Sequence, residues 1–428
     1  MNAIELNVND FKAIKKANIT LDGITVLSGI NGSGKSSLSK LLYFSFKYAN
    51  DFSKLPSKAE HQILEIQSAI NSFRYDPYIR SYFRKNSIKS FYQLNVYPGS
   101  ASDDIKMRYL TILRHYKELY EADNADISNR NGIDRIRYIS EDVLGKKLQD
   151  KSVPELMDLL AERLKTLYED LDKWSQNRPY KDYKDRLEDL LRASIKEVTI
   201  KEYGVPFVGK GVTSVPLLHY IQNVVYIDTP MIVANDRSFN VEHWSDLERF
   251  LEMPKTRYYS RSIYKILKEE IIHGKSENNT DDFGDTIRYK RDDGQSFPLF
   301  DSATGVKSFS VLQMLLRNGS INKNSLIIID EPEAHLHPQW IIEYARIVVK
   351  MHKLLGTKFF IASHSTDFIS AIKAISERER VSNSLRYYLS EEVPGYKYDF
   401  AYRDLGLNIE PIFASFNKSY EKLDAYGK

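Results

Sequence analysis

The sequence contains 428 residues, of which 42% are hydrophobic and 28% are charged, so it can form one large domain with an insertion or two to three domains. Its formal net charge is only +3, and this balance does not by itself indicate a nucleic-acid-binding protein. It contains no cysteine, which excludes disulfides and thiolate zinc sites and fits a reducing compartment.

The amino-terminal stretch, MNAIELNVNDFKAIKKANI, alternates in polarity and carries charge early, unlike a signal peptide. No run of about 18 apolar residues follows anywhere in the chain, so we expect no membrane span. These features predict a cytoplasmic protein without a membrane partner.

A glycine-rich loop stands between a predicted strand and a predicted helix near the amino terminus. Residues 24–29 read ITVLSG, and apolar residues recur at helical spacing from Leu38. Between them, GINGSGKS (29–36) matches G-x-x-x-x-G-K-[ST] in the strand–loop–helix context that this motif needs. Glycines let backbone N–H groups wrap a polyphosphate closely, and the following helix directs its positive end toward it.

This loop therefore predicts a nucleotide site with Mg²⁺. Lys35 would supply charge at the β- and γ-phosphates, and the Ser36 hydroxyl would bind Mg²⁺. A glycine-rich turn with an unrelated lysine is the alternative, which the complete motif disfavours. The loop residues predicted to bind nucleotide are Asn31, Gly32, Ser33, Gly34, Lys35, Ser36 and Ser37.

The middle of the chain is predicted to be a largely helical insertion at 49–189, which divides a head formed by 1–48 and 190–428. Apolar residues three and four apart indicate helices at 57–75, 101–123 and 152–177. Sustained heptads are absent, so we expect a compact lobe rather than a long coiled coil.

A group of aromatic and basic residues lies in this insertion. Stacking and charge could make it a nucleic-acid surface. An amphipathic core helix with a solvated face is the favoured alternative. The residues are Tyr75, Arg80, Tyr82, Arg84 and Lys85.

The chain then returns to mixed elements. The pattern predicts strands at 193–203 and 223–230, helices at 245–253 and 260–274, a flexible loop at 275–285, and a hairpin at 287–300 whose turn is Asp293-Gly294.

A second loop with anion-binding character, DSATG, opens an amphipathic helix after this hairpin. A Ser/Thr/Gly loop at a helix start can hold an anion, although the same residues also form ordinary N-caps. Its candidate nucleotide contacts are Ser302, Thr304 and Gly305.

The stretch NSLIIIDEPEAHLHPQW (324–340) supplies acids at the end of a buried strand. Leu326 to Ile329 is apolar throughout, as in parallel sheets covered on both faces. Asp330 would hold Mg²⁺, and Glu331 would activate the attacking water. Surface acids capping a strand are the alternative, which the phosphate loop disfavours.

A histidine follows the next predicted strand, in TKFFIASHSTDFI (357–369). Because a single helix separates it from the acid-bearing strand, His364 is expected at the same sheet edge, where it could contact the γ-phosphate. A lone histidine is more often structural.

The order of these motifs resembles the ABC-type ATPase superfamily. DEPEAHLHP is similar to the overcoming-lysogenization-defect (OLD) and RecF/SMC-like branch, including ATPase subunits of bacterial antiphage systems such as Septu, PARIS and certain retrons. The resemblance covers about 1–48 and 285–370. It implies an α/β P-loop NTPase fold, the ABC ATPase head, with a mixed β-sheet and a largely helical insertion.

The resemblance also implies roles for individual residues. In this family two subunits sandwich two ATP molecules, each between one phosphate loop and the other subunit's signature loop. It assigns Mg²⁺ to Ser36 and Asp330, the catalytic base to Glu331 and the switch histidine to His364. In the signature loop Ala303 stands where serine is usual, and Ser302 or Thr304 would substitute.

Two further histidines, His335 and His337, follow the acids. The resemblance places Leu336-His337 in the loop that crosses the dimer. A metal pair is the alternative reading, and it lacks nearby carboxylate support.

The predicted function is an ATP-hydrolysing subunit, a homodimer or higher homo-oligomer through its ATP sites, that uses ATP and Mg²⁺ to regulate a nuclease or toxin effector encoded nearby in antiphage defence. A RecF/Rad50-like DNA-repair ATPase that binds nucleic acid is one alternative. An ATP-binding scaffold with little turnover is another, which the unusual signature loop permits.

No Toprim nuclease is expected in this chain. Such a module needs on the order of a hundred residues, more than follow His364. The acids in that remainder, Glu391, Glu392, Asp399 and Asp404, lack its glutamate and Asp-x-Asp pattern.

Overall fold

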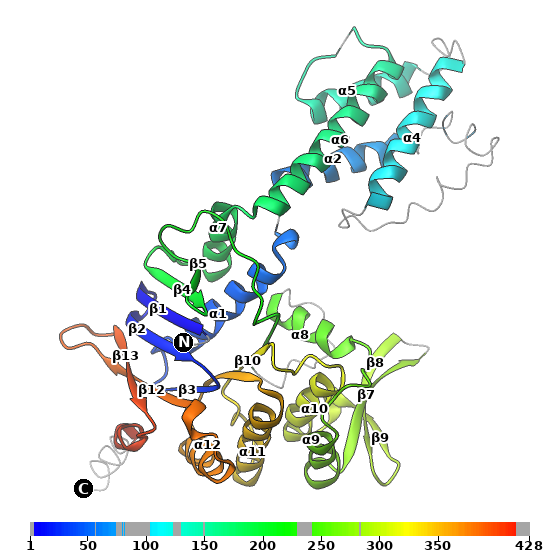
Figure 1. Ribbon diagram of the computed structural model, residues 1–428. Helices are drawn as coiled ribbons and strands as arrows, with labels where there is room; N and C mark the ends of the chain where they lie inside the picture. Colours follow the sequence, from blue (N-terminus) through cyan, green and yellow to red (C-terminus); the bar gives the residue numbers. More distant parts are fainter. Residues whose placement is uncertain are drawn as a thin grey trace, which may run out of the picture. The chain divides into compact units, whose positions relative to one another are not determined.

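The structure, a computed structural model, describes residues 4–416 apart from 56, 74–78, 80, 82–102, 123–129, 149, 229–241 and 282–283. It contains two compact units, which we call the α/β unit (Met1–Asp51 with Tyr183–Lys428) and the helical unit (Phe52–Asp182). Figure 1 shows the elements of each unit along the chain.

The helical unit begins and ends slightly inside the insertion predicted at 49–189. Helix α1 (Lys35–Asn50) continues past residue 48, with Tyr48 and Ala49 buried. Helix α7 (Tyr180–Leu191) is tied to α1, because the Tyr183 hydroxyl donates to the Ser45 carbonyl oxygen at 2.7 Å. Residues at both ends of the predicted insertion are therefore packed in the α/β unit.

Among the described residues, one mixed sheet of ten strands forms the framework of the α/β unit. Five neighbouring strands run parallel to one another, β12, β3, β11, β10 and β6. The order across the sheet is β5 (Val205–Val208), β4 (Val198–Glu202), β1 (Ile4–Phe11), β2 (Ile14–Leu21), β13 (Phe400–Gly406), β12 (Leu385–Glu392), β3 (Ile24–Ser28), β11 (Lys358–Ala362), β10 (Ser325–Asp330) and β6 (Asn223–Ile227).

Helices cover both faces of the parallel part, and every residue of β3, β10 and β11 is buried. Helices α10 (Thr304–Arg317), α11 (Pro338–Leu355) and α12 (Thr366–Glu379) pack on one face, against residues such as Ile327 and Phe359. Helix α1 lies on the other face (Figure 1), where the Tyr43 ring is 5.6 Å from that of Tyr226.

A second sheet of three strands, β7 (Gly274–Asp281), β8 (Gly284–Arg291) and β9 (Ser296–Pro298), precedes α10. The predicted hairpin turn is confirmed, with Gly294 at φ 89°. The remaining elements of this unit are α8 (Glu242–Glu252), α9 (Arg261–Lys265), a π-helical segment (Ile266–Ile271) and 3₁₀ turns at Leu299–Asp301 and Ser382–Ser384.

The flexible loop predicted at 275–285 is wrong, because β7 occupies most of it and pairs with β8. The polar residues that suggested a loop have fixed partners. The Ser276 backbone N–H donates to Gln313 Oε1 at 2.8 Å, and its hydroxyl donates to Ser310 Oγ at 2.7 Å. Hydrogen bonding to α10 thus replaces the apolar burial that a strand pattern usually shows.

The helical unit has its own apolar core. Apolar faces of different helices pack together in it, through residues such as Ile66, Tyr116 and Leu160. The candidate nucleic-acid residues Tyr75, Arg80, Tyr82, Arg84 and Lys85 lie outside the described residues. Its elements are a 3₁₀ turn (Phe52–Lys54), α2 (Lys58–Phe73), α4 (Asp103–Ala122), α5 (Arg130–Leu144) and α6 (Val153–Asn177).

No described helix of either unit combines the length and apolar character that a bilayer crossing would need.

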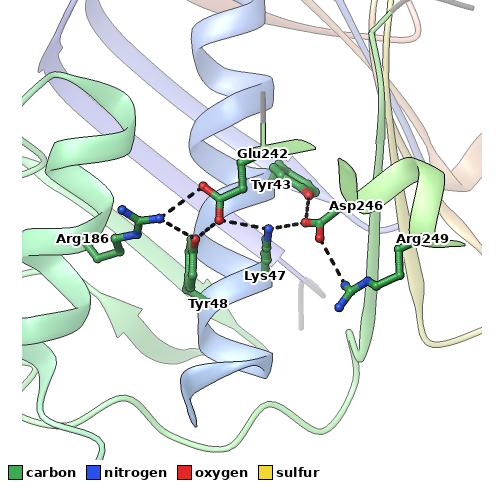
Figure 2. Close-up of polar contacts among 7 residues, drawn as sticks. All are labelled: Tyr43, Lys47, Tyr48, Arg186, Glu242, Asp246 and Arg249. Carbon is green, nitrogen blue, oxygen red and sulfur yellow. Dashed lines mark hydrogen bonds and ion pairs between the residues drawn. The ribbon is translucent and has the colours of Figure 1, made fainter. Parts of the chain in front are cut away.

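A polar network joins α1 to α7 and α8 (Figure 2). Lys47, with an 11% exposed side chain, forms ion pairs with Glu242 and Asp246 of α8. Arg186 of α7 lies 3.5 Å from Glu242 Oε2 and donates to the Tyr48 hydroxyl at 3.2 Å. Lys47 is therefore shared by two carboxylates, and each carboxylate has an arginine as a second partner: Arg186 for Glu242 and Arg249 for Asp246.

We expect the substitution Lys47→Met to destabilise this junction by about 2 kcal/mol, because it removes the ammonium between two partly buried carboxylates, although Arg186 stays beside Glu242 and Arg249 beside Asp246. Hydrogen exchange of α1 and α8 amides at neutral pH measures the loss. Lys265→Met is the matched control, since Lys265 and Glu269 form an exposed pair of the kind worth about 0.5 kcal/mol or less. Equal protection of these amides from exchange in both variants would contradict the stabilising role of Lys47.

Candidate functional site

The carboxyl ends of four parallel strands bring the predicted motifs to one sheet edge. Strands β3, β11, β10 and β6 are consecutive neighbours, and in register Asp330 lies opposite Ala362. The segment after β3 is the glycine-rich loop, β11 leads to His364, and β10 ends in Asp330. The structure thus places together residues that are far apart in the sequence.

The loop needs glycine at two positions. Gly34, just before α1, has φ 92°, and a Cβ atom there would lie 2.6 Å from Ile14 Cγ1. Gly29 has φ 152°, and a Cβ atom there would lie 1.7 Å from Ser390 Oγ. A side chain at either residue would displace β-strand neighbours, so the loop conformation depends on both glycines.

Lys35 folds back over this loop. Its Nζ donates to the carbonyl oxygens of Gly29 at 3.0 Å and Ile30 at 2.9 Å, and only 5% of the residue is exposed. Burial lowers the pKa of Lys35 to about 8, against the opposing effect of nearby Glu331 and Asp330. The ammonium is therefore held in the loop by weak neutral acceptors that an anion can replace.

Asp330 is buried beside this lysine and is held by hydroxyl groups. Ser39 donates to its Oδ1 at 2.5 Å and Tyr226 donates to its Oδ2 at 2.7 Å. Burial raises the pKa of Asp330, while hydrogen bonds from Ser39, Tyr226 and Ser36 oppose that rise. Ser36 and Asp330 are therefore adjacent oxygen donors, the type of ligand that Mg²⁺ prefers.

Glu331 stands at the open side of this edge. Its backbone adopts φ 52° and its N–H donates to the Ala362 carbonyl oxygen at 2.8 Å. Its side chain is 53% exposed, with Oε1 3.7 Å from His364 Nε2. Burial, with a contribution from Lys35, lowers the pKa of His364 to about 4, so its imidazole is neutral at physiological pH.

Glu333 fixes the loop that carries His364. Its carboxylate accepts the Ser363 hydroxyl at 3.0 Å and the His364 backbone N–H at 2.6 Å. Ser365 caps α12 by accepting the Phe368 N–H. In the SHS motif the two serines therefore fix the turn, and His364 stands beside Glu331.

The residues present fit a bound polyphosphate with Mg²⁺. Ser33 Oγ is buried and has no hydrogen-bond partner within the described ranges, in a loop that has no room for a side chain at Gly29 or Gly34. Among the described residues, no cluster of three or more His, Cys, Asp or Glu could hold a metal. The two oxygen donors Ser36 and Asp330 suit Mg²⁺, which commonly binds through one or two protein oxygens together with substrate phosphates. The other predicted contacts, Asn31, Gly32, Ser36 and Ser37, lie along the same loop and first helical turn.

The predicted signature loop lies elsewhere in the unit. Helix α10 begins at Thr304 with Ala303 as N-cap and no side-chain cap, so the ordinary side-chain N-cap is wrong. Gly305 packs against Trp340, whose Cε3 would be 2.1 Å from an added Cβ. Ser302 contacts its own turn at Pro298. Within the described part of the chain, no hydrogen bond or ion pair joins Ser302, Thr304 or Gly305 to the phosphate loop.

His337 serves as the N-cap of α11, where its ring accepts the Gln339 N–H at 3.4 Å. His335 occupies a left-handed turn position, with φ 60°. The two histidines therefore shape the turn between β10 and α11, and the metal reading gains no support.

Four side chains of this site were missed from the sequence. Ser39 lies one turn beyond Lys35, and Tyr226 lies on the predicted strand 223–230. Asp228, at the end of that strand, lies 2.8 Å from His243 Nε2 and accepts Trp244 Nε1 at 3.1 Å. Glu333 lies in the DEPEAHLHP motif, but no role was predicted for it. Acids and hydroxyls following buried strands, as at Asp330, are the signal that would have found Asp228.

Comparisons with known proteins agree with this geometry. Residues 24–370 match the family model described as "AAA domain, putative AbiEii toxin, Type IV TA system". No curated protein matches the chain in sequence.

Similar solved structures include three SMC head domains. The head from Thermotoga maritima is 12% identical, covers 95% of this chain and 99% of its own, and has a TM-score of 0.37. The head bound to the C-terminal domain of ScpA, from Pyrococcus furiosus, is 11% identical over 100% of both chains, with a TM-score of 0.36. The head with a coiled coil and joint from Pyrococcus yayanosii is 10% identical over 98% and 100%, with a TM-score of 0.38.

The family model includes both the phosphate loop and the acid-bearing strand, and the predicted α/β P-loop fold with a mixed sheet is confirmed. The match extends over most of the chain, from β3 to α12. The chain belongs to this family of AAA-domain proteins.

Proposed function

We propose that the chain is an ATPase subunit that binds ATP with Mg²⁺ at the edge of β3, β10 and β11, and that its nucleotide state regulates a partner protein. One observation carries this proposal. Asp330 accepts hydrogen bonds from hydroxyls of α1 beside Lys35, so the phosphate loop and the acid-bearing strand form one site.

Each side chain of the site is proposed to have a separate role in hydrolysis. Loop amides and Lys35 would bind the phosphates, which positions them and stabilises their charge. Glu331, exposed at the edge, would accept the proton of the attacking water. Neutral His364 would donate a hydrogen bond near the γ-phosphate. Mg²⁺ held by Ser36 and Asp330 would neutralise phosphate charge.

The hydroxyl of Tyr226 is expected to position Asp330 for Mg²⁺. Tyr226→Phe removes one of its hydrogen bonds, and losing a bond to a charged group lowers affinity by roughly tenfold or more. We expect the half-saturating Mg²⁺ concentration to rise by about that factor while metal-free ATP binding is unchanged.

Tyr43→Phe is the matched control for this prediction. Its ring stacks near that of Tyr226, yet its hydroxyl donates to Asp246. An equal rise in the Mg²⁺ requirement of both variants would show that ring contacts, and not the hydroxyl on Asp330, are responsible.

The proposal extends to assembly. Ser302, Thr304 and Gly305 lie at the start of α10, which has no side-chain cap, and this leaves its first N–H groups for an anion. We propose that they complete the ATP site of a second copy, as a homodimer or higher homo-oligomer in the cytoplasm.

The partner is proposed to be a nuclease or toxin effector of antiphage defence. The family description names a toxin of a toxin–antitoxin system, a pairing of two components, and this supports partner regulation. A RecF/Rad50-like repair role is the alternative. An ATP-binding scaffold is favoured by Ala303, which offers no hydroxyl at the start of α10.

Purification of the native complex with ATP, followed by mass spectrometry and phosphate-release assays, tests these functions. A stoichiometric effector whose activity changes with nucleotide supports the proposal. Turnover strongly stimulated by duplex DNA ends, without an effector, would favour repair. Stable ATP-bound oligomers that release no phosphate would favour the scaffold. A chain that binds no ATP would overturn all three.

A further inference from the structure

Four cationic side chains converge on one carboxylate at the boundary of β7, α8 and α10. Glu277 of β7 is 16% exposed and receives all of them. The distances from its carboxylate oxygens are 2.9 Å to Lys255 Nζ, 3.3 Å to Lys275 Nζ, 3.5 Å to Lys290 Nζ and 3.8 Å to Arg317 Nη1.

This cluster carries an excess of positive charge. Partial burial opposes ionisation of Glu277, but hydrogen bonds and charge from Lys255 and Lys275 lower its pKa to about 2. Its negative charge is therefore already present at physiological pH, and one carboxylate faces four cations. The exposed Glu252 adds a second acid, which still leaves the cations in the majority.

A cavity of about 290 Å³ opens beside the cluster. Lys255, Glu277 and Arg317 line its charged side. Its other walls include the apolar side chains of Leu251, Met253 and Met314. A concave, largely apolar cavity with a few convergent polar groups is typical of small-molecule sites, and its volume is close to their lower range of about 300 Å³.

Arg317 lines the cavity with an incompletely hydrogen-bonded guanidinium. In the part of the chain that the structure describes, its buried Nη1 makes no hydrogen bond, since 3.8 Å to Glu277 is too long for one. The guanidinium is held in place over the Tyr264 ring, 5.5 Å from its centroid. A carboxylate or phosphate in the cavity could pair with this guanidinium, whose fork of N–H donors suits both groups.

We propose that this cavity binds a small organic anion, whose carboxylate or phosphate contacts Arg317 and Lys255 and whose apolar body contacts Leu251, Met253 and Met314. The site is separate from the proposed ATP site. None of the residues that line the cavity belongs to the phosphate loop or to the acid-bearing strand. Arg317 also lies at the far end of α10 from Gly305, about 18 Å away along a helix that rises 1.5 Å per residue.

Calorimetric titration of the full-length protein with four probes tests the proposal. Phenyl phosphate and benzoate carry both an anion and an apolar body, inorganic phosphate lacks the body, and benzyl alcohol lacks the charge. We expect phenyl phosphate or benzoate to bind more tightly than either of the others. The tighter of the two identifies the head group as phosphate or carboxylate.

Three variants give responses of opposite sign. Arg317→Gln and Lys255→Gln should each weaken the binding of the preferred probe by roughly tenfold. Glu277→Gln removes the competing negative charge and should strengthen it, an effect that mere destabilisation does not produce. Lys265→Gln, at an exposed ion pair with Glu269, is the matched control and should change nothing.

The phosphate loop is intact in all of these variants, so binding there cannot distinguish them. Lys255 is 44% exposed, and its variant is expected to fold; melting temperatures without probe check this. Equal affinity of the anions for wild type, Lys255→Gln and Glu277→Gln would overturn the proposal. So would benzyl alcohol binding as tightly as benzoate, or failure of both organic anions to bind.

Discussion

Replacing Glu331 with glutamine is expected to lower the rate of ATP hydrolysis by at least about a hundredfold while ATP still binds, because general bases typically contribute factors of about 100 to 10,000. Glutamine keeps the size and the polar amide oxygen but cannot accept a proton from water. Glu331 is exposed and lies beside His364, and among the described residues it has no hydrogen bond or ion pair to the phosphate loop. Phosphate release and equilibrium ATP binding measure the two effects separately.

The same variant should accumulate as an ATP-bound oligomer, because hydrolysis is proposed to open it. Size-exclusion chromatography with and without ATP measures this shift. Glu343→Gln is the matched control, since Glu343 lies on α11 in an ion pair with Arg346. Wild-type turnover in Glu331→Gln would remove this glutamate from its role, and loss of ATP binding would show that it acts in binding.

The parallel half of the fold could be predicted because its strands are buried on both faces. The strands at 24–28, 325–330 and 358–362 are mostly apolar without alternation, and each is followed by a loop with a distinct motif. Strands β12 and β13 escaped prediction, since their paired residues include charges such as Arg386 and Asp404, 3.1 Å apart across the hairpin. Ion pairs there replace an apolar pattern.

The polar strand β7 escaped for a related reason. Its serine, asparagine and glutamate residues resemble a loop, and only their partners show otherwise. Ser276 binds Gln313, and three of the four cations around Glu277 come from other segments of the chain. Local propensity cannot report such long-range satisfaction of polar groups.

The central residues of the site could be predicted from the sequence because their motifs have a fixed local geometry. Glycine spacing and the acid after β10 predicted that Lys35, Ser36 and Asp330 would meet. The supporting side chains could not be predicted, since only their contacts with Asp330 identify Ser39 and Tyr226 as part of the site. Sequence alone shows which strands end in acids, but not which hydroxyls from another helix face them.

Replacing Lys35 with alanine is expected to weaken ATP binding by at least about a hundredfold, since it removes charge-assisted hydrogen bonds to the phosphates. The free protein should keep its fold, because within the described structure the Lys35 ammonium bonds only to the carbonyl oxygens of Gly29 and Ile30. Lys40→Ala, in the next turns of α1, is the matched control for charge. Fluorescence titration with ATP and thermal unfolding measure binding and folding separately.

A pH titration sharpens this prediction. Burial lowers the pKa of Lys35 to about 8 in the free protein, so the ammonium predominates below that pH and the neutral amine above it. Because phosphates bind the charged form, ATP affinity should change little between about pH 7 and 8 and fall by up to about tenfold per pH unit above 8. Lys35→Arg stays charged over this range and should lose the pH dependence. An unchanged affinity of wild type from pH 7 to 10, or full ATP binding by Lys35→Ala, would show that the loop amides bind the phosphates without this ammonium.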